Sequence, residues 1–561
     1  MLTADLESVF GDPFDHANPV GHDAVLAADE RSEPLVAGEQ ALDAWQANAE
    51  FVPAELGGRL TTVDALVRRL RPVFRRDAAL GLGYGVTSLM AALNVWSGGT
   101  DAQRKQLADT LLDGQRVCVA YHELAHGNDV TANEMRAVRR GMSLVLDGRK
   151  EVINNAGRAD HAVVFARTDE RAGGRSHSLL LVDLSELPAD RWRRLPRYRT
   201  MGLRGCHLGG LEFHGCPAPE SALVGDVGAG ADIALRSFQV SRCVTAGLGV
   251  GVLDAALFTV LRFARGRRLY GRTVAQIPHA RSTLAGAFTD LLIADSLSTV
   301  AARSIHLLPA NGAVYAAATK YLVPLLLEQA MDELAVILGA RFYLREGDQA
   351  IFGKHFRDLP ALSIGHAGGV SCQLTMLPQL PQLARSLDRA AQAPTALFDD
   401  SAELPKLALD ALRLRSGPTD PVLAGLPDLL TALRRADRTE DTAALAAELL
   451  AELAELRYDI AATTPHDLGV LAPPAALALT ERYATLLAAA ACLGTWRHRR
   501  RSGDTAWIRL ALHRLLARSR PGVLVQPAEL DEALFTELTE RAAHGQDFCL
   551  DAGRVHRQLV D

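Results

Sequence analysis

Residues 142–146 (Met-Ser-Leu-Val-Leu), 162–166 (Ala-Val-Val-Phe-Ala) and 178–182 (Ser-Leu-Leu-Leu-Val) decide the fold class. Each is a short run of apolar and β-branched residues, and turn residues separate the runs, which is the pattern typical of β-strands. The dipeptides Asp147-Gly148 and Gly173-Gly174 are predicted to form turns. These strands predict a β-domain that extends over residues 116–227.

Both flanks of this β-domain carry helical periodicity. Thr100 stands where it would cap a helix that begins at residue 101. Helical periodicity returns after residue 228 and continues to about 390, and it resumes beyond a linker at 391–404. Apolar residues with helical spacing share one face at Val63, Leu66, Val67, Leu70 and Val73, and again at Leu445, Leu449, Leu453 and Leu456.

This order predicts a mainly α protein with a central β-domain. The expected domains are an N-terminal helical domain (1–115), the β-domain (116–227), a helical bundle (228–390) and an additional helical domain (405–561). A chain of 561 residues is long enough for several domains, and its 48% hydrophobic content supplies their cores.

Composition excludes several classes of protein. The net charge of −6 lacks the basic excess of a nucleic-acid binder, so no nucleic-acid partner is expected. The seven cysteines form no CxxC pair, which argues against a zinc or other metal site and fits reduced thiols in the cytosol. The N-terminus is acidic and has no signal-peptide pattern. The longest apolar runs, such as residues 488–493, are short for a bilayer, so no membrane span is expected.

Several segments resemble motifs of the acyl-CoA dehydrogenase family, and they occur in that family's order over about residues 40–385. Residues 120–129 (Ala-Tyr-His-Glu-Leu-Ala-His-Gly-Asn-Asp) resemble its Leu-Thr-Glu-Pro-x-x-Gly-Ser-Asp motif, and residues 146–155 resemble its Gly-x-Lys-x-Trp-Ile-Thr-Asn strand. The other matching segments are residues 52–58, 99–103, 241–249, 267–271 and the pair Arg357-Asp358.

This resemblance implies an N-terminal helical domain, a middle β-barrel, a C-terminal four-helix bundle and, here, an added helical domain. It also implies a site for FAD, and a helix bordering the substrate that carries Ser241 and Arg242. Arg267 and Tyr270 match residues that reach the FAD of a neighbouring subunit, so a homodimer or homotetramer is expected. The positions matching cofactor contacts are Tyr121, His122, Gly127, Asn128, Val152, Asn154, Arg267, Tyr270 and Gly339.

The chain departs from the family pattern at several cofactor positions. His122 stands for a Thr, Val152 for a Trp that stacks on the flavin ring, and Pro278 for a Gln. The family's Gln-x-x-Gly-Gly-x-Gly loop matches residues 335–341, where only Gly339 is kept. We therefore expect FAD to be bound through altered contacts.

The largest departure is at the catalytic base. The family has a catalytic Glu where this chain has His366, and some members have it where this chain has Ser241, so neither position carries a carboxylate. An imidazole titrates near neutral pH and is the side chain most often used for proton transfer, which makes His366 the candidate acid or base. The alternative is that position 366 has been freed from catalysis.

Other charged and polar residues have structural as well as functional interpretations. Glu123 is expected to be a structural carboxylate, and His122 to act mainly through its backbone. Residues 346–348 are expected to form a loop before a helix, and Cys243 and Cys372 to pack as small apolar side chains. The arginines at 191–204 and 497–501 are either solvated surface or a dock for CoA phosphate, phosphopantetheine or an acidic carrier protein.

The expected function is that of a cytoplasmic FAD-dependent oxidoreductase acting on an acyl thioester, which is an acyl-CoA or an acyl chain on a carrier protein. The reaction is α,β-dehydrogenation or a related flavin oxidation, as in secondary-metabolite relatives of the family. Non-redox chemistry, such as cyclisation or dehydration with His366 moving a proton, is the alternative. Flavin-dependent oxygenation and a non-catalytic scaffold also remain open.

Overall fold

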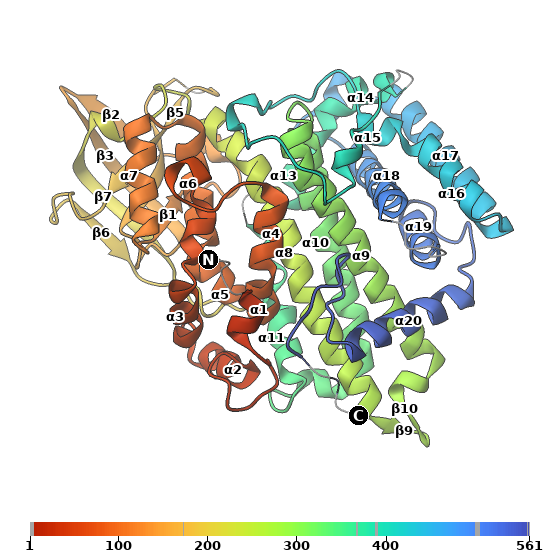
Figure 1. Ribbon diagram of the computed structural model, residues 1–561. Helices are drawn as coiled ribbons and strands as arrows, with labels where there is room; N and C mark the ends of the chain where they lie inside the picture. The colour runs from red at the N-terminus through yellow and green to blue at the C-terminus, as the bar shows by residue number, and fades with distance from the viewer. Residues whose placement is uncertain are drawn as a thin grey trace.

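The computed structural model describes residues 5–171, 173–365, 368–387, 391–499, 505–557 and 559. The chain begins with helices that pack beside the β-domain (Figure 1). They are α1 (Leu6–Phe10), α2 (His22–Arg31), α3 (Val36–Ala44), α4 (Val63–Arg76), α5 (Ala78–Gly81), α6 (Thr87–Gly98) and α7 (Asp101–Leu112). A π-helix, Leu82–Val86, joins α5 to α6.

Two sequence predictions for these helices are confirmed. The apolar residues of α4 are buried, and the helix packs on α8 of the bundle. Thr100 caps α7 through a capping box, in which its hydroxyl accepts from the Gln103 N–H and the Gln103 side chain accepts from the Thr100 N–H. These local signals therefore set where the helices begin and which face they bury.

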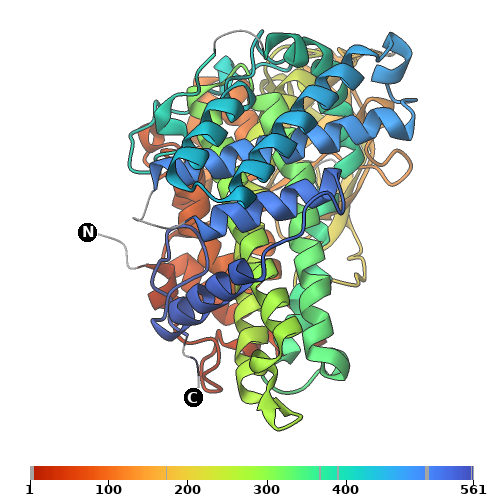
Figure 2. The ribbon, with the colours of Figure 1, turned by 90° about the vertical axis from the view of Figure 1, so that its right-hand side faces the viewer.

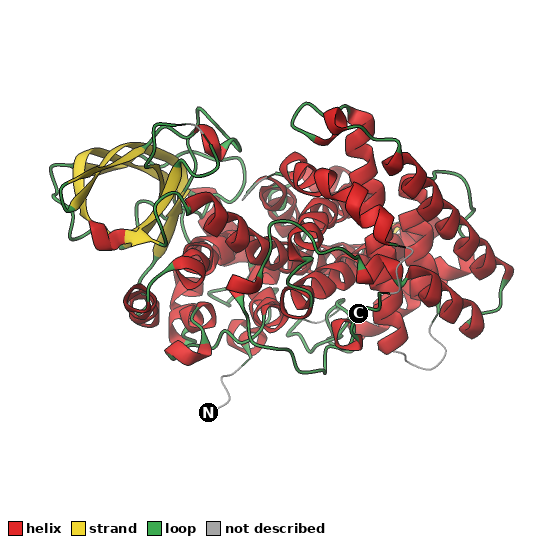
Figure 3. Ribbon diagram, turned by 90° about the horizontal axis from the view of Figure 1, so that it is seen from above, coloured by secondary structure: helices red, strands yellow, loops and turns green. Residues whose placement is uncertain are grey.

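The β-domain follows directly after α7. Its strands are β1 (Val117–Ala120), β2 (Arg136–Arg140), β3 (Ser143–Asn154), β4 (His161–Arg167), β5 (His177–Asp183), β6 (Trp192–Leu195), β7 (Leu208–Pro219) and β8 (Leu223–Val224). The sheet order is β6-β7-β3-β2-β4-β5-β8, with β1 parallel to β4. Seen from above, the strands curl into a barrel (Figure 3). The barrel has a core of its own, which includes Leu146, Val164 and Phe213.

The predicted turn at Asp147-Gly148 is wrong. Both residues lie inside β3, which runs on to Asn154. The register with β7 shifts between Leu146 and Gly148, and Gly148 has φ +119°. A glycine with positive φ is therefore used for a β-bulge that bends the strand, and the Asp-Gly signal does not end it. The glycines 173 and 174 do lie in a turn.

The next part of the chain is a helical bundle. Its long helices are α8 (Gly230–Gly266), α9 (Pro278–Leu307) and α10 (Gly312–Leu338). A hairpin, β9 (Arg268–Leu269) with β10 (Arg272–Thr273), joins α8 to α9. The fourth helical layer is broken into α11 (Ala350–Asp358), α12 (Ala361–Ile364), α13 (Gly369–Met376) and α14 (Leu380–Ser386). The break after α11 falls at Pro360, which cannot donate to the preceding turn.

Additional helices follow the bundle, and the last three of them lie against α9 (Figure 2). The additional helices are α15 (Pro421–Ala424), α16 (Leu426–Ala436), α17 (Glu440–Ala461), α18 (Pro474–His498), α19 (Ala506–Ser519) and α20 (Ala528–Ala543). The predicted leucine face of α17 is buried. Beside that face, Glu448, Glu452 and Glu455 pair with Arg520.

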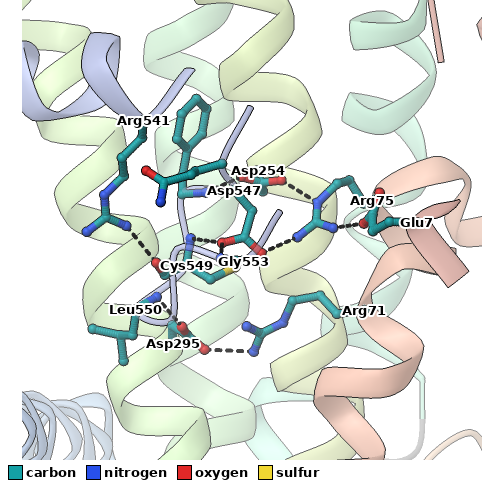
Figure 4. Close-up of polar contacts among 12 residues, drawn as sticks. Glu7, Arg71, Arg75, Asp254, Asp295, Arg541, Asp547, Cys549, Leu550 and Gly553 are labelled. Carbon is teal, nitrogen blue, oxygen red and sulfur yellow. Dashed lines mark hydrogen bonds and ion pairs between the residues drawn. The ribbon is translucent and has the colours of Figure 1, made fainter. Parts of the chain in front are cut away.

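The segment after α20 returns to the junction of α4 and α8 through buried charges (Figure 4). Asp547 accepts from Arg75 of α4 at 2.9 Å, and the Leu550 N–H donates to Asp295 of α9 at 2.9 Å. Asp254 of α8 contacts both Arg75 and Arg557. Residues 547–557 are thereby tied to helices from the N-terminal part and from the bundle.

Some of the helices meet the length and composition of membrane spans. They are Ala78–Gly98, Gly230–Gly266, Pro278–Leu307 and Pro474–His498, and the apolar windows are 94%, 100%, 94% and 78% buried inside the protein. The absence of a membrane span stays a prediction.

Candidate active site

Tyr121 follows β1, and its hydroxyl, ring and carbonyl all contact neighbouring residues. Its hydroxyl donates to Asn94 Oδ1 of α6 at 2.6 Å, and its ring lies 5.6 Å from that of Phe165 and 5.8 Å from that of Phe238. Its carbonyl accepts from Asn133 Nδ2 at 2.7 Å and from a buried lysine, Lys150. The segment that leaves the barrel here is therefore rigidly placed between α6 and α8.

The next residues, His122 and Glu123, make contacts within the β-domain. The His122 carbonyl accepts from the Glu151 N–H at 2.9 Å. Glu123 accepts from the N–H groups of Glu134 and Met135 and from Lys150 Nζ at 2.7 Å. Burial raises the pKa of Glu123, but Lys150 and the N–H donors outweigh it and hold the pKa below its ordinary value. Glu123 is thus a structural carboxylate, as the sequence predicted.

The loop then turns at Gly127 and lies against the start of α13. Gly127 has φ +54°, and no atom lies within 4 Å of the place a Cβ would take. A Cβ built on Gly368 would lie 3.6 Å from Asn128 Nδ2. The structure therefore brings together two segments that are far apart in the sequence, the one containing Gly127 and the one around residue 368.

Val152 and Asn154 lie at the far end of β3. Val152 has φ +56°, at a second register shift of the β3–β7 pair, which is a strained conformation for a β-branched residue. Asn154 Nδ2 donates to Leu82 O at 2.9 Å and to Thr87 Oγ1 at 2.7 Å, while its Oδ1 is buried without a partner among the described residues. Nothing in the residue type of Val152 indicated this backbone conformation.

Ser241 and Arg242 lie in the buried middle of α8. The Ser241 hydroxyl stays within its helix, at 3.4 Å from the Phe238 carbonyl. The Arg242 side chain is 3% exposed, and its guanidinium lies 6.0 Å from the centre of the Phe238 ring. Arg242 makes no hydrogen bond or ion pair with any residue that the structure describes. Phe238 therefore lies between Arg242 and Tyr121.

Three further candidates lie away from the loop at residues 121–129, namely Arg267, Tyr270 and Gly339. Arg267 and Tyr270 are exposed at the β9–β10 hairpin, and Tyr270 is 92% exposed with φ +54°. Gly339 ends α10 with φ +57°. Figure 1 places the hairpin at the opposite end of the bundle from the β-domain. Within one chain the hairpin is thus separated from the loop at residues 121–129.

His366 lies outside the described residues, but the chain just before it is anchored by α10. Lys320 Nζ donates to the Leu362 carbonyl, and the Ser363 hydroxyl donates to Glu328. The Gly365 N–H donates to the Ala361 carbonyl at 3.0 Å. The residues that lead to position 366 are therefore held against the bundle.

The remaining sequence candidates are mostly engaged in structural contacts. Arg193 pairs with Glu212, Arg204 with Asp29, and Arg197 donates to the Cys206 carbonyl, so much of the basic stretch serves the fold. Arg499 pairs with Asp400 and Asp551, whereas residues 500 and 501 are not described. Cys243 and Cys372 are buried. Burial raises the pKa of the Cys243 thiol to about 12. Residues 344–349 form the predicted loop before α11.

Metal ligands do not cluster in the parts of the chain that the structure covers. No group of three or more His, Cys, Asp and Glu side chains is arranged there to hold an ion.

Comparison with known proteins identifies both central parts of the chain. The acyl-CoA dehydrogenase middle domain matches residues 118–216, and the acyl-CoA dehydrogenase C-terminal domain matches residues 228–375. Mitochondrial isovaleryl-CoA dehydrogenase of Solanum tuberosum is 26% identical over 259 residues, which is 45% of this chain and 62% of the relative. The chain thus matches about three fifths of that relative's length.

Solved structures share the fold. Butyryl-CoA dehydrogenase from Megasphaera elsdenii superposes with a TM-score of 0.57 at 19% identity, over 63% of this chain and 92% of that one. The prolyl acyl carrier protein oxidase AnaB has a TM-score of 0.56 at 18% identity, again over 63% and 92%. Residues 118–216 and 228–375, which form the barrel and much of the bundle, therefore belong to the acyl-CoA dehydrogenase family.

Proposed function

We propose that this protein is an FAD-dependent enzyme that oxidises an acyl thioester, by α,β-dehydrogenation or a related flavin oxidation. The observation that carries the proposal is the proximity of Asn128 to Gly368, where an added Cβ would lie 3.6 Å from Asn128 Nδ2. It joins the loop matching the family's flavin segment to the segment in which the family has its catalytic carboxylate.

The residues present fit a flavin dinucleotide. Gly127 leaves open space beside its backbone, which permits the close approach that a phosphate needs. The unpartnered Asn154 Oδ1 is a buried acceptor available to a ligand N–H. When bound, FAD would supply the acceptor for the electrons that leave the acyl chain. The chain's own residues bind and orient that group and exclude water from it.

Proton transfer is the second requirement of this chemistry, and we propose His366 for it. Neither Ser241 nor position 366 offers a carboxylate, and a neutral imidazole accepts a proton near pH 7. Leu362 and Ser363, which precede His366 in the chain, are anchored by α10. Arg242 is proposed as the substrate-binding cation on α8.

The acyl group is carried by CoA or by a carrier protein. The structural similarity to a prolyl acyl carrier protein oxidase supports carrier-bound substrates, and with them a place in secondary metabolism. A protein-bound substrate would need a docking face. Arg199, which is exposed beside the barrel, is one basic residue available for acidic partners.

A homo-oligomer completes the proposed site. Arg267 and Tyr270 extend into solvent at the end of the bundle away from the barrel, so they can reach a flavin only in a second subunit. A guanidinium pairs well with a pyrophosphate, which gives Arg267 a role at that position.

The test is the visible absorption spectrum of purified protein, dialysed after addition of FAD, for the wild type and a matched glycine pair. Gly127→Ala and Gly141→Ala both replace a left-handed glycine that has open space around it. Both variants therefore carry similar local strain, and only Gly127→Ala should lose retained flavin. Absence of retained flavin in the wild type would overturn the proposal.

The reaction products separate the remaining alternatives. Bleaching of the flavin by an acyl thioester under anaerobic conditions, with formation of the enoyl thioester, is the expected result. Oxygen consumption without an enoyl product would indicate oxygenation, and turnover without flavin would indicate non-redox chemistry. His366→Ala should abolish the proton-dependent step, and His366→Glu should restore part of it.

A further inference from the structure

Among the residues that the structure describes, the interface of α8 and α10 contains two buried cations and no carboxylate paired with either of them. Arg242 and Lys320 are 3% and 2% exposed, respectively. Arg242 has no hydrogen-bond partner among the described residues, and its Nε is buried. Lys320 has a backbone carbonyl, Leu362 O, as its partner. An uncompensated charge in the interior is costly, so this arrangement needs an explanation.

The other buried cations in the described parts of the chain show that a buried cation without a carboxylate partner is unusual in this protein. Lys150 and Lys354 both have carboxylates in contact, and so do most of the buried arginines. The paired residues are Arg71, Arg75, Lys150, Arg303, Lys354, Arg509 and Arg557. Arg76, which also lacks an ion pair, donates to the carbonyls of Val20 and Gly11. Arg242 lacks even such contacts.

The nearest acidic side chains do not form an ion pair with either cation. Burial lowers the pKa of Lys320 to about 8, and the positive charge of Arg242 lowers it further, which means that the cations feel one another. Cys372 and Glu328 act in the opposite direction, and Glu328 is engaged by the Ser363 hydroxyl. The relatives that this chain resembles have a carboxylate at the position of His366, and this chain does not.

We propose that Arg242 and Lys320 form a subsite for an anion, and that the acyl group of the substrate carries a carboxylate. This rests on the proposed acyl-thioester function and names the class of its substrate. A guanidinium binds a carboxylate through parallel N–H donors, and an ammonium adds a compact point charge. Phe238 connects Arg242 to Tyr121, so the subsite lies beside the loop proposed to hold the flavin.

The test compares acyl thioesters that differ only in charge. The probes are succinyl, glutaryl and adipyl pantetheine, each beside the methyl ester of its free carboxylate, titrated calorimetrically into the flavin-loaded protein. The best carboxylate should bind about tenfold or more tightly than its ester, as expected for a desolvated charge pair. The preference should fall towards unity in Lys320→Met and in Arg242→Gln.

Lys105→Met is the matched control, because Lys105 is exposed on α7 and pairs with Asp109. It should keep the full preference for the carboxylate. Equal binding of acid and ester by the wild type, or an unchanged preference in Lys320→Met, overturns the anion subsite. Binding and oxidation of the esters would then leave the thioester function standing, whereas binding of neither probe would overturn both.

Discussion

Asp254 and Arg557 form a bidentate ion pair in the interior of the protein. Arg557 Nη1 lies 2.9 Å from Asp254 Oδ2, and Nη2 lies 3.0 Å from Oδ1. The same carboxylate contacts Arg75 and accepts from the Phe548 N–H at 2.8 Å. Burial raises the pKa of Asp254, but the guanidinium groups outweigh it and lower the pKa to about 2.

Asp254→Asn should be strongly destabilising. The substitution keeps the shape but removes the negative charge that Arg75 and Arg557 share, which leaves buried cations under-compensated. Loss of one partner from a buried pair costs roughly 3–5 kcal/mol. The measurement is the urea midpoint of unfolding. Asp109→Asn, in the exposed pair with Lys105, should change stability by less than about 1 kcal/mol. Similar midpoints for both variants would contradict this role.

Replacing Lys320 should change the free energy of unfolding in the opposite direction from replacing Lys150. Burial lowers the pKa of both amines to about 8, but Lys150 has Glu123 at 2.7 Å, whereas Lys320 contacts no carboxylate of the described residues. Lys150→Met should destabilise the free protein, because it leaves Glu123 buried and unpaired. Lys320→Met should stabilise it.

The pH dependence of this stabilisation follows from the direction of the shift. The pKa of Lys320 is lower in the folded protein than its ordinary value of 10.5. Folding therefore favours the neutral amine, and the wild type loses stability as the pH falls from about 10.5 to about 8. Below pH 8 the free energy of unfolding of Lys320→Met should therefore exceed that of the wild type by on the order of 3 kcal/mol. Thermal unfolding from pH 7 to 10.5 checks this, and a constant difference across that range would refute it.

His355 should make the protein acid-sensitive. Both ring nitrogens are buried without partners among the described residues, and burial, aided by Lys354, lowers the pKa to about 3 despite Asp358. The neutral imidazole contributes its full stability above pH 6.5, the ordinary pKa of histidine, and this contribution is lost as the pH falls towards 3. At pH 5 the loss should be about 2 kcal/mol. His355→Leu should flatten the melting temperature between pH 7 and pH 5, whereas replacing the exposed His544 should not.

Val152→Gly should stabilise the protein, although it removes a side chain from a strand. The left-handed conformation of Val152 costs on the order of 1 kcal/mol or more, and glycine adopts it without strain. Val145→Gly is the control in the same strand, because Val145 has no positive φ, and it should destabilise by about 1 kcal/mol. Equal losses in both variants would exclude strain at Val152.

Much of the fold could be predicted from the sequence because its signals are local. The capping of α7 by Thr100 and the leucine face of α17 both depend on residues close in sequence, and both were predicted. The bulge at Gly148 was not, because an Asp-Gly pair is also the strongest signal for a tight turn. The broken fourth helix follows from Pro360, a signal that was present but unused.

The site was less predictable, since its features depend on distant neighbours. The motif positions Gly127 and Asn128 were named from the sequence, but the proximity of Asn128 to Gly368 is a property of the fold. Arg242 was expected at the substrate, whereas its lack of a partner and the second buried cation, Lys320, were not visible without burial. The backbone strain at Val152 likewise has no signature in its residue type.

The pairing of Asp254 with Arg557 also orders events during synthesis. The partners are 303 residues apart, so α8, which contains Asp254, is made long before Arg557. A nascent or truncated chain that has completed the bundle would have Arg75 but not Arg557 on Asp254, and an open seam between α4 and α8. Such a chain lacks the closing contacts of residues 547–557, and it should remain a loose intermediate that proteases and chaperones recognise. The closing segment thus makes maturation depend on the synthesis of residues 547–557.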